Sequence, residues 1–364
     1  MMLRRALALV AASSVAFVSA CAGGDSRETV VVTSVKWVNP DGSEIEGEDG
    51  PDGEKGSSTS NWRELYAKVL DAPGEQNFDV PLATDGELDF TLNGNYNYAL
   101  VEANGGGNPE LLLSQWGDNM HSDRYASVLV FTTDGGSLEV ADQSLVYGAA
   151  GAGGFRAGLF ASQLGRGLYQ TTHSSGTGEG QSTWVDLEGS SLVASQESSG
   201  FSAMNSSPLH LVIDWMTPED RAPLDAGELT VHLEESTVER VGGEDVVIEG
   251  TVVKKTGTEL QPEGMPNGED PSSEYFLLEL DSPQEFTDYQ HAGSVYTKST
   301  DSVSLGRRET GARGHQYLQN LEWEKVVGQR VRLTVAPQYM HFQTDAGMPM
   351  GALRVGRYEK VEIL

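Results

Sequence analysis

Three side chains with metal-ligand chemistry lie close together in the stretch Trp116–Asp123. They are Asp118, His121 and Asp123. Imidazole and carboxylate groups at such short spacing suit zinc or manganese. A polar stretch of this kind also suits the tip of a hairpin. The sequence therefore leaves a transition-metal site and a solvated turn as alternatives.

No familiar catalytic motif accompanies this cluster. The seven histidines are scattered singly, and Gly-x-Ser-x-Gly, His-Glu-x-x-His, Walker and Ser-x-x-Lys signatures are missing. The Gly-rich run Gly148–Phe155 has no strand–helix–strand pattern around it, so it predicts a flexible loop rather than a dinucleotide site. A triad assembled from distant residues stays open, because triads are defined by geometry. A pair of carboxylates for glycoside hydrolysis stays open for the same reason.

The charge balance narrows the classes of partner. The chain has 364 residues, with 24 basic against 54 acidic ones and a formal charge of −30. Phosphate neutralisation needs clustered Lys and Arg, so we expect no nucleic-acid partner. A single cysteine allows no intramolecular disulfide and no Cys-based zinc site.

Residues 1–20 have the pattern of a secretory signal peptide. Arg4 and Arg5 precede the uncharged apolar stretch Ala6–Val18, which is shorter than the roughly 20 residues that span a bilayer. The segment Val18-Ser19-Ala20-Cys21 resembles the lipobox of bacterial lipoproteins, and the composition favours a Gram-positive, actinobacterial-like source. The resemblance implies that cleavage leaves Cys21 first and that its thiol carries a lipid. An ordinary secretory signal with an incidental cysteine is the alternative.

Residues 21–60 predict an acidic, Gly-rich disordered linker. Six carboxylates fall within residues 44–55, and little apolar content is present to offset the entropy of ordering.

Residues 61–217 predict a β-rich domain preceded by one short helix. In Asn61–Leu70, apolar residues recur with helical spacing, and Pro73-Gly74 ends the helix. Short alternating runs broken by turn residues then predict strands. The expected strands are 88–92, 96–102, 111–115, 126–132, 137–140, 167–172, 182–187, 192–195 and 209–215. A hairpin signal near Asp134 recurs near Glu188, at a spacing that suits blade-like repeats.

The stretch Tyr98–Leu113, with its Gly105-Gly106-Gly107 centre, is similar to the calcium loops of FG-GAP and VCBS-like proteins. There a strand enters a loop of the form Asp-x-Asp-Gly-Asp-Gly-x-x-Glu and leaves as an aliphatic strand. The resemblance implies oxygen ligands from Glu102, Asn104 and Glu110, while Gly106 replaces a fourth ligand. Calcium prefers six to eight oxygen ligands, so we expect a degenerate loop with weak calcium binding at most and no other cofactor.

Residues 227–364 predict a second β domain, which begins after the polar, Pro-containing segment Pro218–Ala226. The candidate strands are 228–233, 246–254, 275–280, a short one at 302–305, 331–335, and one or two within 353–363. Apart from the short strand, the expected order is strand, strand, strand, helical turn, strand, strand. The segment Trp323–Val335 carries a resemblance to OB-type barrels, which often bind oligonucleotides or sugars. Arg307, Arg308 and Arg313 predict a small solvated basic loop.

These features together predict a mainly β protein: a blade-like antiparallel domain and a small OB-like barrel. We expect a lipoprotein held at the extracytoplasmic face of the cell membrane through Cys21. Its expected role is a non-catalytic binding module for an envelope protein or glycan. The alternative is an envelope hydrolase whose active site is not recognisable from sequence.

Overall fold

The computed structural model describes residues 61–84, 91–118, 124–134, 136–149, 155–203, 207–236, 238–289, 295–310, 317–343 and 347–364. The predicted signal peptide, Cys21 and the acidic linker lie outside these residues, as do His121 and Asp123.

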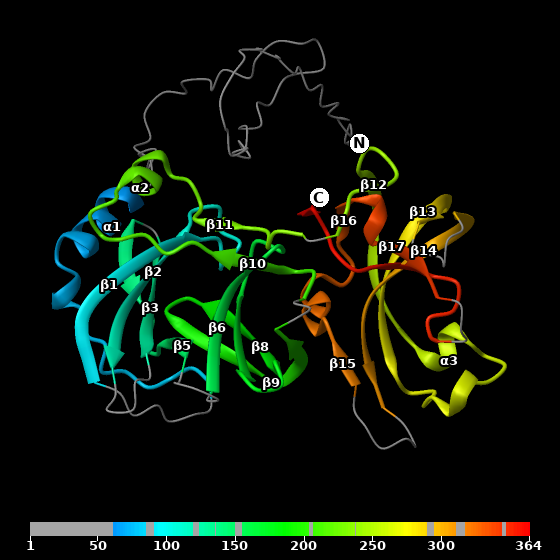
Figure 1. Ribbon diagram of the computed structural model, residues 1–364, viewed down its shortest axis with the longest axis horizontal. Coiled ribbons are helices and arrows are strands. Elements are labelled where there is room, and N and C mark those ends of the chain that lie inside the picture. The colour runs from blue at the N-terminus through cyan, green and yellow to red at the C-terminus, as the bar shows by residue number, and fades with distance from the viewer. Residues whose placement is uncertain are drawn as a thin grey trace, which may run out of the picture. The chain divides into compact units, whose positions relative to one another are not determined.

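The fold is mainly β, as the sequence predicts. The first sheet has eleven strands in the order β1-β2-β3-β5-β6-β7-β8-β9, with β4 beside β3 and with β10 between β6 and β11 (Figure 1). Its strands are β1 (Thr91–Val101), β2 (Glu110–Asp118), β3 (Arg124–Asp134), β4 (Ser137–Val140), β5 (Leu145–Ala149), β6 (Phe155–Ser162), β7 (Leu168–Ser174), β8 (Glu179–Glu188), β9 (Ser191–Ser202), β10 (His210–Ile213) and β11 (Val231–His232). All of these pairings are antiparallel, because short connections join strands that are mostly neighbours in the chain.

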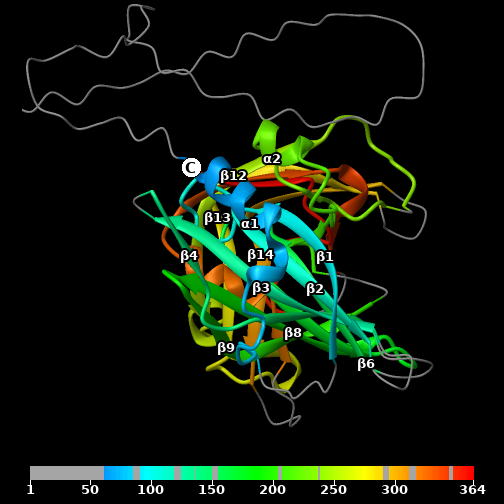
Figure 2. The ribbon, with the colours of Figure 1, turned by 90° about the vertical axis from the view of Figure 1, so that its left-hand side faces the viewer.

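The predicted helix is present as α1 (Trp62–Asp71), and the short helix η1 (Pro73–Glu75) follows it. Trp62, Tyr66 and Val69 are buried on one face of α1 and pack on the aliphatic side chains of β1, β2 and β3. Figure 2 shows α1 lying across these strands. The side chain of Asn61 does not cap the helix. Burial of its apolar face therefore holds it in place.

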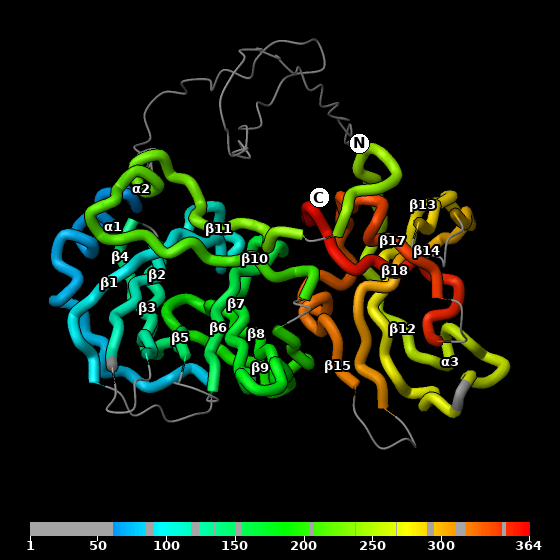
Figure 3. Tube along the Cα trace, viewed as in Figure 1, coloured from blue at the N-terminus to red at the C-terminus, as the bar shows by residue number. Residues whose placement is uncertain are grey.

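The chain leaves β10 and returns along the outer edge of β1 before it reaches β11 (Figure 3). Tyr98 exchanges two backbone hydrogen bonds of 2.8 Å with Met216, and Leu100 accepts a backbone hydrogen bond of 2.9 Å from Thr230. Between these points lies α2 (Ala222–Ala226), whose Leu224 is buried against the α1 side of the sheet. The segment Pro218–Ala226 is thus packed on the first sheet, and its role as a domain boundary stays a prediction.

The second sheet curls on itself and contains the predicted strands from residue 246 onward. The predicted strand 228–233 is wrong as a member of this sheet: its counterpart is β11, which pairs with β10 in the first sheet, because the chain returns along β1 at Thr230. The resemblance to OB-type barrels stays a prediction. A meander of three long strands is followed by a helical turn, and the last strands pair with both sides of the meander. The elements are β12 (Val246–Thr256), α3 (Gly257–Leu260), η2 (Pro266–Gly268), β13 (Glu274–Asp288), β14 (Tyr296–Glu309), β15 (Tyr317–Gln319), η3 (Leu321–Val326), β16 (Arg330–Val335), η4 (Pro337–Tyr339), β17 (Met340–Phe342), β18 (Leu353–Val355) and β19 (Lys360–Ile363). β18 pairs in parallel with β14, and β19 pairs with β16. The final segment of the chain therefore contacts both sides of the curled sheet.

The core of the second sheet extends into the first. Ile248, Phe276 and Trp323 are fully buried, and Tyr169 and Trp184 from β7 and β8 belong to the same apolar cluster. Residues 58–364 form one compact unit. Removal of this shared apolar surface from water stabilises the contact between the sheets.

Candidate functional site

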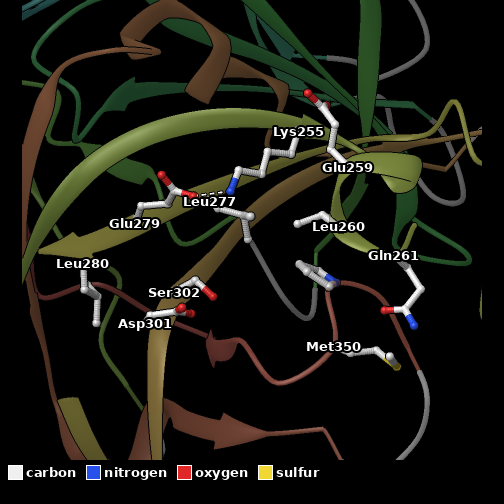
Figure 4. A pocket seen from close by; sticks show the side chains of 11 residues that line it. Lys255, Glu259, Leu260, Gln261, Leu277, Glu279, Leu280, Asp301, Ser302 and Met350 are labelled. Atoms are coloured by element: carbon white, nitrogen blue, oxygen red, sulfur yellow. Dashed lines mark hydrogen bonds and ion pairs between the residues drawn. The ribbon is translucent and has the colours of Figure 1, made fainter. Parts of the chain in front are cut away.

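A cavity of about 520 Å³ opens on the face of the curled sheet. Its walls come from the end of β12, from α3, from β13 and β14, and from the segment before β18 (Figure 4). This volume is within the usual range for small-ligand sites, roughly 300–1,000 Å³. The cavity is the candidate site that the geometry favours most.

Acidic groups outnumber basic ones around this cavity. Lys255 forms an ion pair with Glu279, which Figure 4 marks by a dashed line. Glu259 and Asp301 are further carboxylates at the wall, and both residues are exposed. Asp301 has no hydrogen bond or ion pair within the described residues. The cavity thus presents net negative charge and one carboxylate available to a ligand.

A bulge in β13 lies opposite Asp301. Glu279 pairs with Ser302 and Gln284 pairs with Thr300, so the four residues Leu280–Pro283 of β13 face the single residue Asp301 of β14. A bulge disrupts the ladder and bends the strand that carries the extra residues. Asp301 therefore lies where the pairing of β13 with β14 is interrupted, at the wall of the cavity.

The α3 wall is fixed by a capping box. The Thr256 hydroxyl accepts a hydrogen bond from the Glu259 backbone N–H, and the Glu259 carboxylate accepts one of 2.7 Å from the Thr256 backbone N–H. These bonds satisfy backbone donors at the start of the helix. The backbone hydrogen bond from Thr256 lowers the pKa of Glu259, so its carboxylate stays charged beside the cavity.

Arg354 of β18 holds the wall on the opposite side. Its guanidinium donates hydrogen bonds of 2.6 Å to the Met348 carbonyl and to the Ser304 hydroxyl of β14. Pro349 and Met350, which line the cavity, follow directly in the chain. The cavity wall is therefore formed by residues far apart in sequence, and the hydrogen bonds of Arg354 stabilise one side of it.

The predicted calcium loop is the connection between β1 and β2, where Val101 pairs with Glu110. Glu110 is fully buried, and its carboxylate accepts hydrogen bonds from the Ala103 backbone N–H at 2.6 Å and from the Thr132 hydroxyl at 3.2 Å. Burial raises the pKa of Glu110 to about 8, against the effect of the Ala103 N–H, and the charge of Glu102 raises it further. Glu110 thus acts as an internal brace of the loop.

Asn104 and Glu102 are the other two predicted calcium ligands, and backbone N–H groups of the loop already interact with both. Asn104 Oδ1 accepts a hydrogen bond of 2.5 Å from the Gly106 backbone N–H, and its Nδ2 donates to the Thr132 hydroxyl at 3.2 Å. Burial raises the pKa of Glu102, while the backbone N–H groups of Gly105–Gly107 lower it. One oxygen of Glu102, Oε1, is buried without a partner in the described part of the chain.

These contacts do not fit a complete calcium site. Glu110 and Asn104 already accept hydrogen bonds from the chain, Gly106 supplies no side chain, and calcium needs six to eight oxygens. Over the residues that the structure describes, no three His, Cys, Asp or Glu side chains form a group able to hold a metal ion. The hydrogen bonds within this loop instead stabilise a tight turn. Weak calcium binding stays a prediction.

The remaining predicted residues are dispersed. Asp118 ends β2, but the rest of its cluster is outside the described residues. The run Gly148–Phe155 begins within β5 and ends at the start of β6, two strands that the sequence patterns missed. The predicted solvated basic loop is wrong for Arg307 and Arg308, which lie on β14 and form ion pairs, Arg307 with Glu309 and Arg308 with Glu197, Glu274 and Glu324. Arg313 lies outside the described residues.

Sequence reasoning missed the cavity residues. The capping-box pattern Thr256–Glu259 was a visible signal, and the two-residue spacing of Leu277 and Glu279 places both on one face of β13. Nothing in the sequence indicates that Asp301, Met350 and Lys255 line one cavity.

Comparison with known protein families, curated proteins and solved structures finds no match to this chain. None of the helices in the described ranges has the length and apolar character needed to cross a bilayer. The function must therefore be argued from the sites themselves.

Proposed function

We propose that this protein is a bacterial lipoprotein, held by Cys21 at the extracytoplasmic face of the cell membrane, that acts as a non-catalytic binding module of the envelope. The single observation that carries the binding role is the acidic cavity on the curled sheet. Its position between two long connections and the β13–β14 face is consistent with the proposed resemblance to OB-type barrels, which bind ligands on such a face.

The net negative charge of the cavity indicates the chemical class of its ligand. Glu259 and Asp301 are not neutralised by Lys255, which is already paired with Glu279. A nucleic acid would be repelled, whereas a protonated amine would be attracted. Leu260 and Met350 supply a small apolar surface beside these charges. An amine-bearing group of an envelope protein or of an amino-sugar glycan has this combination of properties.

A hydrolase remains the second candidate because of one contact. Ser182 Oγ lies 3.4 Å from His210 Nε2 in another part of the molecule. Burial lowers the pKa of His210 to about 3, and its Nδ1 has no partner in the described residues. A general base works best with a pKa near the working pH and with an orienting partner. These features favour the binding role over catalysis.

The test uses calorimetric titration of the full chain with a glucosamine disaccharide and with a short lysine peptide. We expect binding to at least one probe, and Asp301→Asn should weaken it about tenfold, which corresponds to about 1.4 kcal/mol. Glu285→Gln is the matched control, since it removes one exposed charge from the same sheet outside the cavity. Equal weakening by both variants would indicate diffuse charge attraction and would contradict a site in the cavity. Absence of binding to both probes would also contradict it.

A further inference from the structure

A second hollow lies between the two sheets, away from the acidic cavity. It consists of two adjoining parts of about 360 Å³ and about 130 Å³, which share Ser182, Ser199 and Glu322. We call it the inter-sheet cleft. β8 and β9 form one side, and β15 with η3 forms the other. We infer that the inter-sheet cleft is a second binding site, and that its ligand is a neutral, hydroxyl-rich molecule of the sugar class.

Most of the charged groups around the cleft are already paired. Arg308 binds Glu197 at 2.6 Å and also contacts Glu274 and Glu324. Lys325 binds Asp186 at 2.5 Å. A charged ligand would have to displace these partners. Among the charged residues that line the cleft, Glu179 alone is exposed and outside these pairs in the described chain.

The most buried carboxyl group that lines the cleft, that of Glu322, already has a hydrogen-bond partner. Glu322 is 6 % exposed, and the Tyr169 hydroxyl donates a hydrogen bond of 2.9 Å to its Oε1. Burial raises the pKa of Glu322 to about 7. An anionic ligand would be repelled by the ionised form of this group. A neutral hydroxyl is compatible with either form, because it both donates and accepts hydrogen bonds.

Uncharged polar side chains in the cleft remain available to a ligand. Ser199 lines both parts of the cleft, and Gln319 lines the larger part. Neither side chain has a hydrogen-bond partner in the described residues. His210 also lines the larger part, but it is only 5 % exposed, and its Nδ1 is buried without a partner in the described residues. Ser199 and Gln319 are therefore the groups open to a ligand hydroxyl, which can donate or accept a hydrogen bond.

An aromatic side chain lies at the rim of the cleft. Tyr317 is 48 % exposed, and the Arg307 guanidinium covers its ring from 4.4 Å. An exposed ring of this kind offers an apolar face and a hydroxyl together. Sugar rings present apolar C–H faces edged by hydroxyls, so Tyr317 and the neighbouring polar side chains match both parts of a sugar.

The register of β8 and β9 supplies a matched pair of variants. Ser182 is opposite Ser199, and Thr183 is opposite Ser198. Ser199 lines the cleft, whereas the Ser198 hydroxyl bonds to Thr183 at 2.7 Å and does not line it. Replacing each serine by alanine removes the same atoms from the two faces of one strand.

The experiment labels the full chain with 5-fluorotryptophan and follows fluorine NMR signals in a buffer free of sugar-based detergents. Trp184 lines the cleft and Trp62 lies on α1, so their signals report the cleft and a remote position. Substitution of each Trp by Phe assigns the two signals. The probes are maltose, cellobiose and lactose, with a glucosamine disaccharide and a glucuronate disaccharide as charged counterparts.

We expect at least one neutral disaccharide to shift the Trp184 signal saturably and to leave the Trp62 signal unchanged. Ser199→Ala should weaken this binding about fivefold, as expected for one hydrogen bond of about 1 kcal/mol. Ser198→Ala should leave it unchanged. The inference is overturned if no neutral disaccharide shifts the Trp184 signal, if a charged counterpart binds more tightly, or if Ser198→Ala weakens binding as much as Ser199→Ala.

Discussion

The hydroxyl of Tyr169, on β7 of the first sheet, donates a hydrogen bond of 2.9 Å to Oε1 of Glu322, in η3 of the second sheet. Both side chains are buried. A buried polar pair of this kind contributes modestly when complete and costs more when one partner is removed. The pair therefore links the packing of one sheet to that of the other.

Tyr169→Phe should lower the free energy of unfolding by about 1–3 kcal/mol, because it leaves a buried carboxyl without its donor. Urea unfolding followed by circular dichroism measures this loss. Tyr66→Phe removes a hydroxyl that donates hydrogen bonds to the backbone carbonyls of Pro109 and Phe131, away from the second sheet. Two separate unfolding transitions in Tyr169→Phe, but one in Tyr66→Phe, would be the specific sign of uncoupled sheets. A free energy unchanged by Tyr169→Phe would contradict this role.

Glu322 also makes stability depend on pH. Burial raises its pKa from 4.5 to about 7, so the folded state holds the proton more tightly than the unfolded state. Its contribution is therefore complete below about pH 4.5 and is lost as pH rises through 7. Glu322→Gln should gain stability relative to the parent between pH 5 and pH 8, as measured by urea midpoints. A constant difference between the two proteins over that range would contradict the assignment.

Ionisation of Glu110 should also lower the stability of the protein as pH rises, but over a higher pH range than that of Glu322. Burial first, and the charge of Glu102 next, raise its pKa to about 8 against the opposing Ala103 N–H. The parent should therefore lose stability as pH rises from about 5 to about 9, by roughly 2–4 kcal/mol at most, and Glu110→Gln should remove that part of the slope. Glu285→Gln, at an exposed position, should leave the slope unchanged. Equal slopes in the parent and in Glu110→Gln would contradict the raised pKa.

Calcium should change the melting temperature little. The loop from Glu102 to Glu110 engages Asn104 and Glu110 internally, and a ligand stabilises a fold only by RT ln(1 + [L]/Kd). Magnesium at matched ionic strength controls for general screening of the acidic surface. A rise of several degrees that is specific for calcium and absent in Glu110→Ala would restore the metal site.

Two glycines near each other in the first sheet should respond very differently to alanine. A Cβ at Gly180 would lie 1.8 Å from the Thr172 carbonyl oxygen, whereas a Cβ at Gly200 would meet nothing within 4 Å. Gly180→Ala must push β7 and β8 apart and should cost about 1–3 kcal/mol or more. Gly200→Ala should stay within about 0.5 kcal/mol of the parent. Equal thermal stability of the two variants would be inconsistent with this packing.

The proposed lipid attachment depends on Cys21. If this thiol accepts the acyl group, Cys21→Ser should abolish labelling with palmitate, and the protein should no longer partition with membranes. Unchanged labelling of the Cys21→Ser protein would refute the lipoprotein proposal and favour an ordinary secretory signal.

Periodicity predicted those elements whose two faces differ in polarity. The helix α1 and the strands β8 and β12 repeat or alternate, because one face of each is more buried than the other. The strand β2 was predicted from its continuous aliphatic run, which is buried on both faces. The strand β6 was missed because Ala157, Gly158 and Ala161 give little contrast, although Ala157 and Ala161 are buried. Small residues there permit close packing rather than a strong apolar signal.

The two hollows could not be predicted for a different reason. Lys255, Asp301 and Met350 meet only because β12, β14 and the segment before β18 are brought together by long-range pairing. Ser199 and Glu322 are even less connected in sequence. Carboxylates and serines are common surface residues, so their types alone carry no information on which of them converge.

The segment between β10 and β11 covers the outer edge of β1. Without Met216 and Thr230, the outer edge of β1 around Tyr98 and Leu100 would present free N–H and C=O groups to another polypeptide. Such edges promote intermolecular β-pairing and aggregation. Molecules tethered to a membrane, as proposed here, share a surface at high two-dimensional density. The segment that occupies the edge of β1 therefore acts as a built-in protection against self-association.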